Sequence, residues 1–145
     1  MNNLNILAIG NSFSQDATRY IHRITRSDGF NLNVTNLYIS GCPIDRHFRN
    51  MISGSRDYEL EYNGELTFFK VSLEEALLNR EWDYITIQQA SHRSSIHDAT
   101  KRAVVTPDTA VIKRVYELTL NPFIFPDITI KKPITVHSTL LIVFI

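Results

Sequence analysis

The first fourteen residues contain the feature that most constrains the fold. Leu4–Ile9 is a short apolar run that predicts a buried strand, and it ends at Gly10. A helical pattern of apolar residues begins a few positions later. We therefore expect Ser12 on a strand-to-helix turn at the carboxyl end of a strand, which is where open α/β sheets bind their ligands.

Two interpretations of Ser12 follow from this position. The unpaired N–H groups at a helix N-terminus favour developing negative charge, as a nucleophilic serine requires. Ser12 and Gln15 also have the Ser-x-x-Gln spacing of a helix capping box, which needs no chemistry. The local pattern alone leaves both interpretations open.

Strand and helix patterns alternate along the following residues. Residues 32–39 and 84–87 are predicted as further strands, and Pro43 is typical of the first turn of a helix between them. The first helix is predicted to bury one continuous face that carries Ala17, Tyr20, Ile21 and Ile24. The alternation predicts one α/β domain with a parallel sheet covered by helices.

A β-hairpin interrupts this alternation. Two strand-like runs between Tyr58 and Val71 flank Asn63-Gly64, which is the strongest short hairpin signal. We expect the hairpin as an insertion at the edge of the main sheet. Ser72 and Glu75 then form a capping box that opens another helix, with Leu73, Ala76, Leu77 and Leu78 predicted to face inward.

The pattern changes after His97. A helix is predicted from Thr106-Pro107 to about Leu120, and one or two strands from the proline-containing remainder. We interpret residues 1–97 as the N-terminal part of one domain and residues 98–145 as its divergent or frameshifted continuation.

Composition excludes several classes of function. Fifteen basic residues balance fifteen acidic residues among 145, so nothing favours nucleic acid or an anionic membrane as a partner. The single cysteine, Cys42, forms no internal disulfide and is typical of a reducing compartment. No signal-peptide or membrane-spanning pattern is present, so a cytoplasmic protein is expected. No residues have metal-ligand spacing, and no cofactor motif occurs.

Polar residues follow each of the three strands. They are Ser12, Gly41 and the pair Gln88-Gln89, and a parallel sheet brings them to one edge. Acyl transfer needs such a set, because a nucleophile must act beside donors aimed at the oxyanion of the tetrahedral intermediate. A turn glycine and a satisfied polar strand end are the structural alternatives at Gly41 and the glutamines.

Three segments resemble a known family. LAIGNSFSQDATRY, NLYISGCPIDRHFRN and WDYITIQQASH are similar to the first three conserved blocks of the SGNH (GDSL-like) hydrolase superfamily, in a bacterial branch with GNSFS in place of GDS. The resemblance runs from about Leu4 to His97. It implies a flavodoxin-like three-layer sandwich and serine-dependent hydrolysis of an ester, often an acyl group on a carbohydrate, without a cofactor.

The resemblance also implies roles for individual residues. Ser12 would be the nucleophile, and the backbone N–H groups of Ser12 and Gly41 would bind the oxyanion. The family's third donor is usually an asparagine; here Gln88 or Gln89 is the best match, and His92 is an alternative.

One family block is missing. The family's base is the histidine of a late Asp-x-x-His block, and this spacing occurs nowhere in the sequence. The sequence therefore predicts a chain truncated or frameshifted before this block, with a sheet incomplete at its C-terminal side. His92 or His97 could replace the missing base by position. Without the base, activity falls by about 10²–10⁴-fold.

Three alternative functions stay open. Cys42, beside a helix that carries His47, could act as a thiol nucleophile. A chain without the base could be a non-catalytic carbohydrate- or acyl-binding module. The turn from Gly10 to Ser14 could bind phosphate, although it lacks the glycine pattern of the known phosphate loops. The sequence does not define the oligomeric state.

Overall fold

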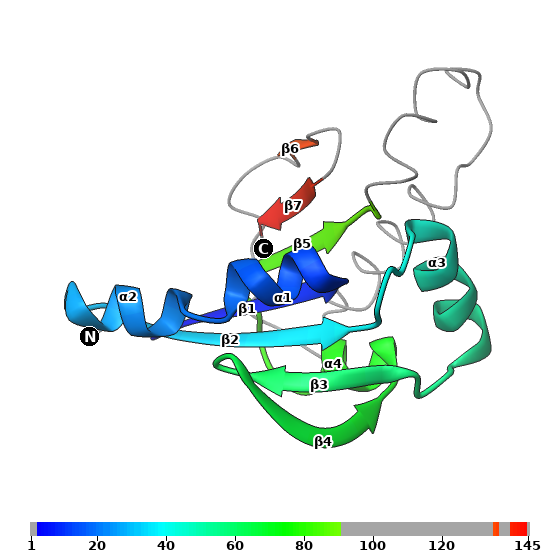
Figure 1. The fold of residues 1–145 in the computed structure, drawn as a ribbon, viewed down its shortest axis with the longest axis horizontal. Coiled ribbons are helices and arrows are strands. Elements are labelled where there is room, and N and C mark those ends of the chain that lie inside the picture. The colour runs from blue at the N-terminus through cyan, green and yellow to red at the C-terminus, as the bar shows by residue number, and fades with distance from the viewer. Residues whose placement is uncertain (1–2, 91–134, 137–139, 145) are drawn as a thin grey trace.

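The computed structural model describes residues 3–90, 135–136 and 140–144, which form one open sheet with helices (Figure 1). The sheet has seven strands in the order β4-β3-β2-β1-β5-β7-β6. Their bounds are β1 Asn3–Gly10, β2 Asn31–Tyr38, β3 Tyr58–Tyr62, β4 Glu65–Val71, β5 Tyr84–Gln88, β6 Thr135–Val136 and β7 Leu140–Phe144. The helices are α1 Ser12–Thr18, α2 Ile21–Ser27, α3 Ile44–Ser53 and α4 Leu73–Leu78.

The three central strands, β2, β1 and β5, are parallel, as the sequence predicts. Gly10 at the end of β1 is in register with Tyr38, and Ile9 is in register with Ile87. The carboxyl ends of these strands therefore lie side by side at one edge. The architecture is the flavodoxin-like α/β sandwich expected for the chain.

Alternate residues of β1 face different layers. Leu7 and Ile9 are completely buried in a core that includes α3 and α4, with Leu77 and Ile85 among its members. Each such side chain stabilises the fold by about 1.5–3 kcal/mol. On the opposite face lie α1 and α2, which Figure 1 shows in front of β1 and β2.

The prediction of one continuous first helix is wrong. The segment forms two short helices, α1 and α2, and the residues that α1 buries are Ser14 and Thr18 rather than an apolar stripe. Tyr20 and Ile24 are more than half exposed. The Thr18 hydroxyl donates to the Ser14 carbonyl at 2.7 Å, and such back-bonding to the preceding turn tends to bend helices.

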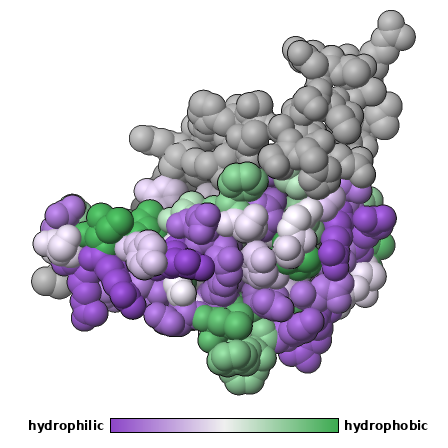
Figure 2. Space-filling view, in the orientation of Figure 1, coloured by the Kyte–Doolittle hydropathy of each residue, from purple (hydrophilic) through white to green (hydrophobic). Residues whose placement is uncertain are grey.

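The hairpin prediction is confirmed. Asn63 and Gly64 have φ values of 51° and 81°, as a two-residue type I′ turn requires, and β3 pairs antiparallel with β2. The outer strand β4 exposes Leu66, Phe68 and Phe69, and Figure 2 shows a hydrophobic patch over this part of the sheet. The hairpin thus widens the sheet beside β2.

The element after the hairpin follows the sequence pattern closely. Both hydrogen bonds of the capping box between Ser72 and Glu75 are present at the start of α4. Leu73 and Leu77 are buried, as predicted, but Leu78 is 37% exposed because the helix ends there.

The described residues of the C-terminal part of the chain form two strands, in agreement with the sequence. β7 pairs antiparallel with β5, and β6 pairs antiparallel with β7. The helix predicted between Thr106 and Leu120 lies outside the described residues.

Candidate active site

The turn between β1 and α1 exposes Ser12 as the first residue of the helix. Asn11, not Ser12, caps α1: its Oδ1 accepts the Phe13 N–H at 3.1 Å. The capping-box interpretation of Ser12 is therefore wrong, because asparagine is among the best N-cap residues and already occupies the position before it. Among the described residues, the Ser12 hydroxyl has no hydrogen-bond partner and stays available.

The same asparagine joins this turn to the next loop. Asn11 is buried, and its Nδ2 donates to the carbonyl of Cys42 at 3.2 Å. Cys42 directly follows Gly41. The hydrogen bond therefore holds the turn that carries Ser12 beside the loop that carries Gly41, as the alignment of β1 with β2 requires.

Ser14, the second serine of the turn, has a structural role. Its hydroxyl lies 2.8 Å from the Asn11 carbonyl and 2.9 Å from Oδ1 of Asn36 in β2. Gly10 makes this packing possible, since a Cβ at Gly10 would lie 2.7 Å from the Ser14 Oγ. The turn is thus packed closely against the sheet, with Ser14 inward and Ser12 outward.

A buried carboxylate extends this network to the hairpin. Nδ2 of Asn36 donates to Glu61 at 2.7 Å, and Gln15 donates to the other carboxylate oxygen. Glu61 is only 5% exposed, and the two amide donors give each of its carboxylate oxygens a hydrogen bond. Sequence reasoning missed this network; the signal was Asn36, a polar residue that falls on the same strand face as the apolar Leu32 and Val34.

Gly41 lies in the loop between β2 and α3 with a φ of 59°, a conformation that favours glycine. The Cys42 N–H donates to the Ile39 carbonyl at 3.2 Å and closes the turn around Gly41. Within the described part of the chain, the backbone N–H groups of Gly41 and Ser12 have no acceptor. Two unpaired backbone donors therefore follow neighbouring strands at this edge.

The two glutamines at the end of β5 have different environments. Oε1 of Gln89 accepts the N–H groups of Ile44, the first residue of α3, and of Ala90, both at 3.0 Å. These bonds fix the amide and leave its Nε2 as a donor. Gln88 lies on the α1 side, where its Cβ is 3.2 Å from the position that a Cβ of Gly10 would occupy. Of the two glutamines, Gln89 is thus the candidate third donor whose amide is held in place by hydrogen bonds.

The structure brings together four of the five predicted site residues, Ser12, Gly41, Gln88 and Gln89, at the carboxyl edge of the parallel strands. His92, the fifth, lies outside the described residues, as does His97. Asn11 is the residue that sequence reasoning missed, although its position before Ser12 was a usable signal.

Cys42, His47 and Tyr58 form a second buried cluster. This cluster argues against Cys42 as a thiol nucleophile. Cys42 and His47 are completely buried, with Sγ 3.6 Å from Nδ1, and Nδ1 lies 2.9 Å from the Tyr58 hydroxyl. Burial raises the pKa of Cys42 to about 12 and lowers the pKa of His47 to about 4. The thiol stays protonated at neutral pH and is inaccessible, so Cys42 is a packing residue.

Two classes of feature are absent from the described residues. No three His, Cys, Asp or Glu side chains there are grouped to hold a metal ion. No helix in this part of the chain is long and apolar enough to cross a membrane.

The fold is an open α/β sheet with an exposed serine and unpaired backbone donors at the carboxyl edge of its parallel strands. The chain belongs to a family described as a domain of unknown function, DUF4886, whose match covers residues 5–120. That match extends beyond His97.

A solved structure agrees with this assignment. The chain is similar to a DUF4886 family protein from Bacteroides uniformis, at 35% sequence identity and a TM-score of 0.67. The alignment covers 78% of this chain and 45% of the Bacteroides chain, so this chain spans less than half of that protein. Among curated proteins no match is found.

Proposed function

We propose that the chain is a serine ester hydrolase of the SGNH type, acting on an acylated carbohydrate or another small ester. The observation that carries this proposal is the role of Asn11. Because Asn11 caps α1, the hydroxyl of Ser12 is free of any capping bond, and the same side chain holds the Gly41 loop next to it.

The residues divide the reaction between them. The Ser12 Oγ attacks the ester carbonyl, its proton passes to a base, and the base protonates the departing alkoxide. Water then hydrolyses the acyl-serine and restores the hydroxyl. The N–H groups of Ser12 and Gly41 and the Nε2 of Gln89 stabilise the oxyanion of both tetrahedral intermediates.

We propose the base from the sequence positions of the histidines. Two of the five, His22 and His47, lie in the described residues. His47 is completely buried and bonded to Tyr58, so it cannot reach an external substrate. We assign the base to His92 or His97, which follow the Gln89 end of β5 in the sequence.

Hydrolysis assays test the proposal. The chain should release acetate from p-nitrophenyl acetate and from an acetylated sugar, and Ser12→Ala should lower kcat/KM to the background rate. Ser27→Ala is the matched control, because Ser27 is an exposed helical serine whose hydroxyl bonds only a local carbonyl, that of Ile24. Either His92→Ala or His97→Ala should lower kcat by about 10²–10⁴-fold.

The assays also separate hydrolysis from binding alone. A folded chain that binds the acetylated sugar saturably but does not release acetate would be a non-catalytic binding module. Absence of turnover in the wild-type chain would overturn the proposed activity.

A further inference from the structure

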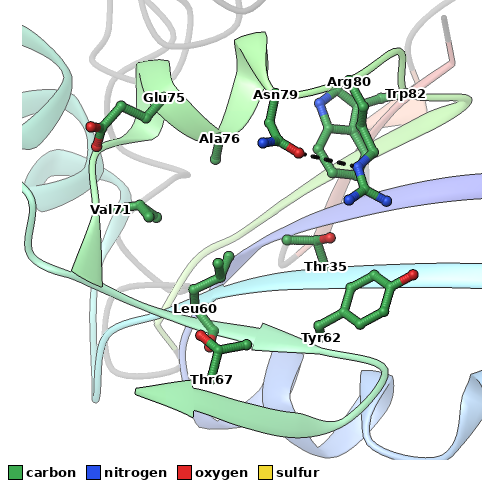
Figure 3. Close-up of a pocket in the computed structure, with 10 residues that line it drawn as sticks. All are labelled: Thr35, Leu60, Tyr62, Thr67, Val71, Glu75, Ala76, Asn79, Arg80 and Trp82. Atoms are coloured by element: carbon green, nitrogen blue, oxygen red, sulfur yellow. Dashed lines mark hydrogen bonds between the residues drawn. The ribbon is translucent and has the colours of Figure 1, made fainter. Parts of the chain in front are cut away.

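A cavity of about 440 Å³ lies between the β3–β4 hairpin and α4 (Figure 3). Its volume is in the range of small-molecule sites. It shares no residue with the candidate active site. Apolar side chains form one part of its wall: Leu60, Val71 and Ala76.

Arg80 supplies the charge of this cavity. Its guanidinium carbon lies 5.6 Å from the centre of the Tyr62 ring and 5.4 Å from the centre of the Trp82 ring. Its Nε donates to Asn79 at 3.3 Å, which leaves the two terminal NH₂ groups directed toward Thr35 and Tyr62 in Figure 3. The aromatic contacts and this bond hold the planar cation in place.

No carboxylate of the described residues neutralises Arg80. The ion pairs among the described residues do not include Arg80. Glu75, the acidic residue that lines the cavity, has other partners. Oε2 of Glu75 accepts the Ser72 N–H at 2.8 Å and lies 3.1 Å from Nε of Arg56. Figure 3 places Glu75 at the end of the cavity opposite Arg80.

One hydroxyl beside Arg80 is also available. Thr35 lies on β2 in the cavity wall, and within the described residues its hydroxyl has no hydrogen-bond partner. The hydroxyl of Tyr62 is not available, since it donates to Asn33 at 3.0 Å. The site therefore offers a planar cation and a hydroxyl at one end, next to an apolar wall.

We propose that this cavity is a second ligand site, which binds a small organic carboxylate with an apolar body. The fork of the Arg80 guanidinium matches the two oxygens of a carboxylate, and the hydrocarbon part fits against Leu60 and Val71. The proposal is independent of ester hydrolysis at Ser12, and binding should persist in Ser12→Ala.

The only tryptophan of the chain makes the site measurable, because Trp82 contacts Arg80 and lines the cavity. Titration with cyclohexanecarboxylate should change Trp82 fluorescence saturably, and calorimetry should give the same affinity. The neutral analogue cyclohexanecarboxamide should bind at least about tenfold more weakly, because it lacks the charge-assisted hydrogen bonds.

Variants identify the cation. Arg80→Gln should weaken carboxylate binding by about tenfold or more, and Arg80→Lys should restore only part of it, since lysine lacks the planar fork. Arg49→Gln, which removes an exposed arginine of α3, should bind like wild type. Thermal denaturation confirms that each variant is folded. Equal binding of acid and amide, unchanged binding in Arg80→Gln, or no saturable binding would overturn the proposal.

Discussion

The side-chain amide of Asn11 donates to the carbonyl of Cys42 at 3.2 Å and accepts the N–H of Phe13 at 3.1 Å. One buried side chain therefore both caps α1 and joins the turn that carries Ser12 to the loop that carries Gly41. Because Asn11 caps the helix, the hydroxyl of Ser12 makes no capping bond.

Loss of this side chain should affect stability. Asn11→Ala removes the cap and leaves the Cys42 carbonyl without its buried donor, so the free energy of unfolding should fall by about 2 kcal/mol. Asn11→Ser keeps a capping oxygen and loses only the bond to Cys42, so its loss should be smaller. Urea denaturation measures both. Equal stability of Asn11→Ala and wild type would contradict the role assigned to Asn11.

Gly41 and Gly29 form a matched pair for testing the proposed oxyanion role of the Gly41 N–H. Both have positive φ, at 59° and 80°, and a Cβ at either position would meet no atom within 4 Å. Because an alanine is strained at positive φ, alanine at either position should lower the free energy of unfolding by about 1–2 kcal/mol. Only Gly41→Ala should also lower ester hydrolysis, because it alone displaces a proposed donor. A similar loss of kcat/KM in Gly29→Ala would show that the effect is one of stability.

Gln89 allows the structural and chemical roles of one side chain to be separated. Gln89→Glu keeps an oxygen for the N–H groups of Ile44 and Ala90, so the free energy of unfolding should change by less than about 0.5 kcal/mol. It removes the Nε2 donor, and kcat should fall by about 10²–10³-fold. Gln88→Ala should have a much smaller effect on kcat. If Gln88→Ala were the more damaging variant, the assignment of the third donor would be reversed.

His47 predicts a pH dependence of stability. Burial lowers the pKa of His47 to about 4, below its ordinary value of 6.5, so the unfolded chain binds a proton that the folded chain does not. The stability that comes from burying a neutral His47 is fully present above pH 6.5. As the pH falls from 6.5 toward 4, proton uptake by the unfolded chain lowers the free energy of unfolding. Between pH 7 and pH 4.5 this costs about 2 kcal/mol.

Denaturation at several pH values checks this prediction. His47→Gln can still bond the Tyr58 hydroxyl but does not titrate, so its stability should fall less steeply with acid than that of wild type. Identical slopes in wild type and His47→Gln would contradict the buried neutral state of His47.

The central sheet was predictable because its strands are short apolar runs with clear ends. Asn63-Gly64 defined the hairpin for a local reason, namely that both residues tolerate positive φ. The edge position of Ser12 and Gly41 followed from the parallel topology alone. These features depend on local sequence patterns and on one rule of topology, namely that the carboxyl ends of parallel strands lie at the same edge of the sheet.

Other features depend on contacts between distant residues and were not predictable. The break between α1 and α2 follows from buried polar contacts of Ser14 and Thr18, which an apolar periodicity does not register. The choice between Gln88 and Gln89 needed the bond to Ile44, 45 residues away. Likewise, the cavity beside α4 is lined by residues from separate elements, and only folding places Arg80 against Tyr62.

The most direct test of an activated Ser12 is covalent labelling. The wild-type chain, Ser12→Ala and Ser14→Ala are treated with a fluorophosphonate, and the adduct is located by mass spectrometry. We expect an adduct on Ser12 in wild type, none in Ser12→Ala, and retained labelling at Ser12 in any folded Ser14→Ala chain. A folded wild-type chain without an adduct, or with the adduct on another serine, would contradict the proposed nucleophile.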